Sequence, residues 1–220
     1  MRNLKTKITF QVLNIFRDFF LYLLLAIGCI LMARNILQYR FFDPGVGFLA
    51  FKQEYLSIKI WNWAFYIHVF SSLFTLLSGF FQFSKFLQSR HRKIHRWIGR
   101  IYVYNILFIN FPAGLIMAIY ANGLWPSKLA FLILDSLWFY FTLRALLEIK
   151  RKNIKAHREF MIRSFALTCS AVTLRSWKIV LTSLFTLDPL HLYMINAWMG
   201  FVPNLIVAEW IIRKNKKING

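Results

Sequence analysis

Between two long apolar runs the chain reads Arg90-His91-Arg92-Lys93-Ile94-His95-Arg96-Trp97-Ile98-Gly99-Arg100, a short basic stretch with two histidines. A second junction of the same kind reads Lys150-Arg151-Lys152-Asn153-Ile154-Lys155-Ala156-His157-Arg158. Basic residues gather at the cytoplasmic ends of membrane-spanning helices. The two stretches therefore predict cytoplasmic loops, each of which turns into a transmembrane helix.

The composition indicates a membrane protein. Of 220 residues, 58% are hydrophobic and 19% aromatic, whereas soluble domains are about 45–50% apolar. The net charge of +20 comes from 28 Lys and Arg against 8 Asp and Glu. Because the cations lie in short blocks between apolar runs, they favour a topology signal and contact with anionic lipid headgroups over nucleic-acid binding. Two cysteines inside apolar runs support no disulfide framework.

Six apolar runs predict six transmembrane helices, because each is close to the length of about 20 residues that spans a bilayer. Their approximate bounds are 19–37, 61–83, 97–120, 127–147, 160–185 and 192–212. The first run is longer than the apolar region of a signal peptide, which favours a retained helix. Residues 38–62 read as a polar loop with a turn at Asp43-Pro44-Gly45.

Lys and Arg concentrate at every second junction: the N-terminus, the loops after the second and fourth runs, and the tail. This alternation is the positive-inside pattern. We therefore predict an all-α fold, an integral membrane helical bundle of six transmembrane helices with both termini cytoplasmic. Residues 1–60 would form a basic segment, the first helix and an outer loop, 61–212 a five-helix membrane core, and 213–220 a basic cytoplasmic tail.

Three ionisable residues are expected at one depth in the outer half of the bilayer: His68, Asp135 and Arg175. A lone arginine there is costly, so an ion pair between Asp135 and Arg175 is expected. With Lys178 and Glu209, this polar cluster would also suit a proton- or solute-coupled transporter.

Two further histidines, His95 and His157, are expected at matching depth at the cytoplasmic ends of the third and fifth helices. A b-type haem needs two imidazoles from facing helices and cations for its propionates. Arg100 and Arg163 are the candidate propionate partners, and His68 is a candidate ligand near the outer face.

These residues predict haem b and electron transfer, with a quinone or another redox protein as partner. His191 is a weaker outer partner for His68. The alternatives are solvated interfacial histidines, a histidine that only supports helix packing, and a membrane scaffold without catalytic activity. No soluble-type catalytic motif is present, so an enzymatic role would be that of a membrane oxidoreductase component.

Several linked motifs resemble those of a known family. They are His68-Val69, Gly79-Phe80-Phe81-Gln82, His95-Arg96-Trp97-Ile98-Gly99-Arg100-Ile101-Tyr102, His157 to Thr168, Ala171-Val172-Thr173-Leu174-Arg175, Ala197-Trp198 and Val202 to Glu209. They resemble the bacterial predicted membrane proteins grouped as domain of unknown function 2306. Phe160 departs from the family, whose members carry Trp before Met in the second histidine motif. The resemblance implies a multi-pass bacterial inner-membrane protein without an assigned activity.

Overall fold

The computed structural model describes the backbone of residues 2–219 and the side chains of 19, 20, 22–84 and 86–217. The side chains of the basic N-terminal segment lie outside these described residues. Within the described part, all regular secondary structure is helical. The main helices are α1 (Arg2–Leu37), α2 (Lys59–Gln82), α3 (Lys85–Arg90), α4 (Arg92–Asn105), α5 (Phe111–Ile119), α6 (Leu124–Lys150), α7 (Ile154–Thr168), α8 (Ser170–Leu184), α9 (Pro189–Met199) and α10 (Val202–Asn219).

Five helical stretches are long and apolar enough to cross a membrane. They are Tyr22–Phe41, Lys59–Gln82, Arg92–Ile119, Leu124–Lys150 and Pro189–Lys217. The third joins α4 and α5 through a π-helical segment, η4 (Ile106–Asn110). Pro112 lies two residues after the end of η4, and a proline has no N–H for the regular helical bond, so local widening of the helix is expected there. The all-α membrane fold is thus confirmed, with five candidate spans.

The expected uninterrupted helix over 160–185 is instead two helices, α7 and α8, which meet at Cys169. Hydroxyl groups bond to backbone carbonyls around this break: Thr168 to Ser164 at 3.1 Å and Thr173 to Cys169 at 3.2 Å. Such bonds compete with the backbone ladder and bend helices. Neither α7 nor α8 is among the five candidate spans.

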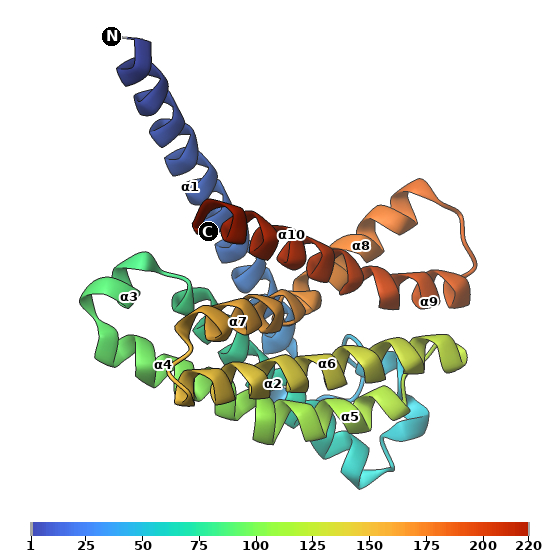
Figure 1. Cartoon of the computed structure of the whole chain (residues 1–220). Helices are drawn as coiled ribbons and strands as arrows, with labels where there is room; N and C mark the ends of the chain where they lie inside the picture. The colour runs from blue at the N-terminus through green and yellow to red at the C-terminus, as the bar shows by residue number, and fades with distance from the viewer. Residues whose placement is uncertain (1, 220) are drawn as a thin grey trace.

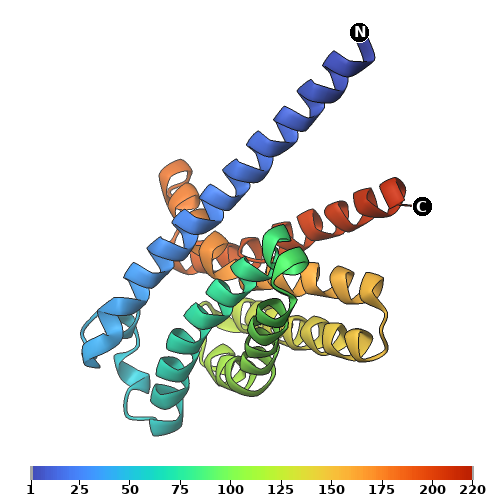
Figure 2. The same ribbon diagram turned by 90° about the vertical axis from the view of Figure 1, so that its left-hand side faces the viewer.

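The two basic junctions lie at the same end of the bundle, hereafter the basic end. Figure 1 shows α3, the start of α4 and the α6–α7 turn there, with the α5–α6 and α8–α9 connections at the opposite end. The α6 helix packs against α7, α5 and α9, and α2 packs against α4 and α5. Figure 2 shows the N-terminal part of α1 projecting beyond the other helices. Both histidine-containing junctions are therefore close in space.

Among the side chains that the structure describes, the buried apolar residues form three clusters. The largest lies where α4, η4, α6 and α7 meet, around Tyr102, Ile106 and Trp138. A second packs residues from 39 to 56 against the start of α2, around Leu49 and Trp61. The stretch predicted as a polar loop is therefore a compact cap of short helical turns, hereafter the opposite cap, because its aromatic and aliphatic residues bury one another. A third cluster joins α1 to α2 and α8.

Candidate functional site

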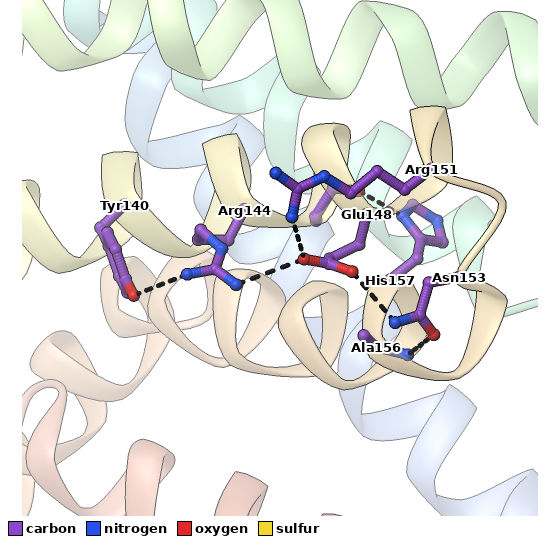
Figure 3. Close-up of polar contacts among 8 residues, drawn as sticks. Tyr140, Arg144, Glu148, Arg151, Asn153, Ala156 and His157 are labelled. Atoms are coloured by element: carbon purple, nitrogen blue, oxygen red, sulfur yellow. Dashed lines mark hydrogen bonds and ion pairs between the residues drawn. The ribbon is translucent and has the colours of Figure 1, made fainter.

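His95 and His157 each lie in the first turn of a helix, α4 and α7 respectively, and the structure brings them within electrostatic range of each other. The Nδ1 atom of His157 lies 2.8 Å from the carbonyl oxygen of Ala145 on α6. A carbonyl only accepts, so Nδ1 carries the hydrogen and Nε2 is left with a free lone pair. Figure 3 shows this imidazole held at the α6–α7 turn.

His95 is anchored through its backbone, while its ring is less constrained. Gln82, the last residue of α2, donates from Nε2 to the His95 carbonyl oxygen at 2.9 Å. Gly99, one turn further along α4, leaves room for this glutamine, since a Cβ there would lie 3.1 Å from its Oε1. The Nδ1 atom of His95 is buried without a hydrogen-bond partner. Two imidazoles from different helices thus each keep one uncommitted ring nitrogen.

A buried carboxylate, Glu148, organises the turn that carries His157 (Figure 3). Its Oε1 accepts from Arg144 at 3.2 Å and lies 3.6 Å from Arg151. Its Oε2 accepts from Asn153 Nδ2 at 3.0 Å, and Asn153 Oδ1 in turn accepts from the amide of Ala156 to cap α7. The carboxylate therefore fixes the first turn of α7 relative to α6.

Sequence reasoning missed Glu148, although a signal was present. An acid placed four residues after one arginine and three before another shares their helix face. Its burial and its bond to Asn153 could not be foreseen, because they depend on how α7 folds back onto α6.

The two expected propionate partners have different surroundings. Arg163 makes a two-point ion pair with Glu209 of α10, Nε to Oε1 at 2.5 Å and Nη2 to Oε2 at 3.1 Å. An arginine held in this way is already neutralised, so the structure does not leave Arg163 free for a propionate. Arg100, on α4, is exposed and open to an anion. One of the two expected cations is therefore available.

The outer histidines do not come together. His68 lies with Nδ1 3.4 Å from the carbonyl oxygen of Asn110, at the end of η4. His191 is exposed and lies 3.3 Å from Asp188, at the start of α9. Asn110 also accepts from Ser71, so His68 belongs to a helix-packing network between α2 and η4. This arrangement gives no support to a second, outer haem.

Asp135 and Arg175 do not form the expected ion pair. Arg175 is exposed on α8 and donates to the carbonyl oxygen of Ala171 at 2.7 Å. Asp135 is buried on α6 against Gly114 of α5, and its Oδ2 atom has no hydrogen-bond partner. The bend at Cys169 gives α8 its own direction, so equal depth did not bring the two side chains together. Neither residue meets His68, and the expected polar cluster is dispersed.

A continuous hydroxyl network ties α4, α6 and α7 together, and we call it the central network. Tyr102 lies with its hydroxyl 2.8 Å from both Ser164 and Thr168. Trp138 donates from Nε1 to Thr168 at 3.0 Å, and Thr142 lies 2.7 Å from Ser164. All five side chains are buried, and each has a partner. Satisfied networks of this kind stabilise one packing arrangement.

The opposite cap contains one buried cation, Lys52. Its ammonium group donates to the carbonyl oxygen of Tyr120 and lies 4.4 Å from the centre of the Tyr55 ring. Burial lowers the pKa of Lys52 from 10.5 to about 8; Glu54 opposes this effect and Lys128 adds to it. This burial could not be predicted from the sequence, because Lys52 lies in a stretch that reads as polar.

Comparison with known proteins places most of the chain in one group. A family model described as "Predicted membrane protein (DUF2306)" matches residues 65–212. No curated protein and no solved structure matches the chain. The matched segment contains the three candidate histidines and Asp135.

Proposed function

We propose, from the premise that the chain belongs to the DUF2306 family of predicted membrane proteins, that His95 and His157 hold a b-type haem at the basic end. The observation that carries this proposal is the approach of two imidazoles from different helices, each with an uncommitted ring nitrogen. Paired imidazoles of this kind are the ligand set of b-type haem in membrane bundles. The donor set therefore fits the group.

The surrounding residues would orient the ligands. The carbonyl of Ala145 fixes the tautomer of His157, and Glu148 fixes the turn that carries it. Such contacts hold a ligand ring in place and keep its free nitrogen directed away from the backbone. Arg100 is the remaining candidate partner for a propionate.

Bound haem would supply one-electron chemistry, and a quinone or another redox protein would exchange electrons with it. In the topology that we favour, α7 and α8 together make a sixth crossing and both termini are cytoplasmic, because all basic segments then share one side. Residues 61–212 are then the functional core. The exposed lysines and arginines of the basic end would contact anionic headgroups of the bacterial inner membrane.

An absorption spectrum of the detergent-purified protein, expressed with haem available, tests the proposal. We expect a Soret band and sharp reduced α and β bands after dithionite, both lost in His95→Ala and in His157→Ala. His91→Ala is the matched control, because His91 is exposed one turn before His95 and should leave the spectrum unchanged. A folded, colourless wild-type protein would reject haem binding and favour a scaffold.

A further inference from the structure

The interface between α6 and α9 contains a row of buried polar side chains. The rings of Phe131 on α6 and Tyr193 on α9 face each other with centres 6.2 Å apart. Ser127 and Asp135 lie four residues before and after Phe131, and Asn196 lies three residues after Tyr193. Residues three and four apart share a helix face. Ser127, Asp135 and Asn196 therefore lie along the same interface as the two rings.

Asp135 and Asn196 lie at one level. The α6 and α9 helices both run from the end opposite the basic loops toward the basic end (Figure 1). One turn along each helix from the ring contact leads to Asp135 on α6 and to Asn196 on α9. Their exposed fractions are 6% and 4%, so water does not reach them from the surface.

The polar atoms of this row lack partners. Asp135 Oδ2, Asn196 Oδ1 and Ser127 Oγ are all buried without a hydrogen bond. A carboxylate oxygen and an amide oxygen can only accept, so two such oxygens side by side would need a hydrogen between them. Buried groups without partners are rare in folded proteins and call for a bound proton, water or ion.

Among the side chains that the structure describes, no cation forms an ion pair with the carboxylate of Asp135. The cations of α7 lie toward the basic end, and Arg163 among them is paired with Glu209. The neighbouring α5 helix and the η4 segment contain no titratable residue. The α9 helix contributes Tyr193 and His191, and the latter is held at the exposed end by Asp188. On α6 itself the nearest cation, Lys128, lies two turns toward the opposite end. An unpaired carboxylate inside a bilayer is energetically costly. Its negative charge must therefore be neutralised by a bound cation.

We propose that Asp135 is a proton-binding site, in which the protonated carboxyl group donates its O–H to Asn196 Oδ1. One proton taken from the aqueous phase converts the carboxylate into a neutral acid and gives both acceptors their missing hydrogen. Gly114 makes room for the acid, since a Cβ there would lie 2.7 Å from Asp135 Oδ1. Ser127 lies two turns nearer the opposite end, against Gly123.

Infrared spectroscopy of the purified protein tests this site without any cofactor. We expect a protonated-carboxyl C=O band at neutral pH that shifts in D₂O and on ¹³C-labelling of aspartate. The band should be lost in Asp135→Asn and should move to higher frequency in Asn196→Leu, because the acceptor is removed. Ser127→Ala should leave its position unchanged, because Ser127 lies two helical turns from Asp135.

The control is Asp188→Asn, which removes an exposed carboxyl group and should leave the band intact. Absence of an aspartate-sensitive band in labelled wild-type protein would overturn the proposal, and this result needs no variant to fold. Persistence of the band in Asp135→Asn would overturn it as well. Because the spectra are recorded without haem, the outcome is separate from that of the haem experiment.

Discussion

The buried face of α6 carries two polar stretches with opposite character, one nearer the basic end and one nearer the opposite end. Toward α7, Trp138 and Thr142 join the central network, in which every side chain has a partner. Toward α9, Ser127 and Asp135 are equally buried but have partnerless oxygens. The first arrangement stabilises a single packing, whereas the second can bind or release a proton without breaking existing bonds. The residues of the first arrangement therefore hold the helices together, whereas those of the second have polar atoms that are available to bind a proton.

The largest loss of stability is expected for Tyr102→Phe. The phenol hydroxyl is the bridge between Ser164 and Thr168, and its removal leaves buried hydroxyls with fewer partners. We expect the free energy of unfolding to fall by about 2–3 kcal/mol, measured by denaturant titration in detergent. Tyr104→Phe, at an exposed position of the same helix, should change it little. Equal effects of the two variants would contradict a structural role for the central network.

A smaller loss is expected for Thr168→Val, which keeps the shape of the side chain. The Nε1–H group of Trp138 then loses its acceptor and stays buried. We expect a cost of about 1–2 kcal/mol and a change in tryptophan fluorescence. Thr182→Val is the control, since Thr182 is exposed and bonds only within its own helix. Unchanged fluorescence together with unchanged stability would show that Trp138 does not depend on this bond.

Lys52→Met should change how stability depends on pH. Because the pKa of Lys52 is about 8 in the folded state and 10.5 in the unfolded state, the unfolded chain binds more protons between these values. Stability of the wild type should therefore rise with pH across that window. The free energy of unfolding of the variant should be about 1 kcal/mol higher than that of the wild type at neutral pH. The part of the pH dependence of stability that comes from Lys52 should be absent.

Melting temperatures recorded from pH 7 to pH 10.5 would test the Lys52 prediction. Lys59→Met, at an exposed position, is the control and should keep the wild-type slope. A slope that persists unchanged in Lys52→Met would show that another group titrates in this window.

The smallest effect is expected for Asn196→Leu, at the partnerless interface. The proposed O–H of Asp135 is the one donor to its amide oxygen, which has no other partner, so the substitution should lower the free energy of unfolding by about 0.5 kcal/mol, the low end for one neutral hydrogen bond. Asn204→Leu provides the contrast, because Asn204 donates to Thr173 and to the Ala166 carbonyl. It should cost about 1 kcal/mol. If Asn196→Leu were the more damaging variant, the α6–α9 interface would be structural.

Hydropathy and charge predicted much of the fold, since apolar length and basic junctions are properties of the chain alone. They located all five candidate spans and the shared end of His95 and His157. They did not predict the break at Cys169, which involves hydroxyl-to-backbone bonds, or the pairing of Arg163 with Glu209 across two helices. Residue counting gives depth in a bilayer but not the direction in which a side chain points.

The short α6–α7 turn has a consequence for membrane insertion. The α7 helix carries Lys155, Arg158, Glu159 and Arg163, and it is too polar to leave the translocon for lipid by itself. Its turn from α6 is closed by the bonds of Glu148 and Asn153. In the six-crossing topology that we propose, the long, apolar α6 helix would therefore remain beside α7 until both enter the bilayer as one hairpin. Insertion of the protein into the membrane would then depend on a turn that helix length and hydropathy do not reveal.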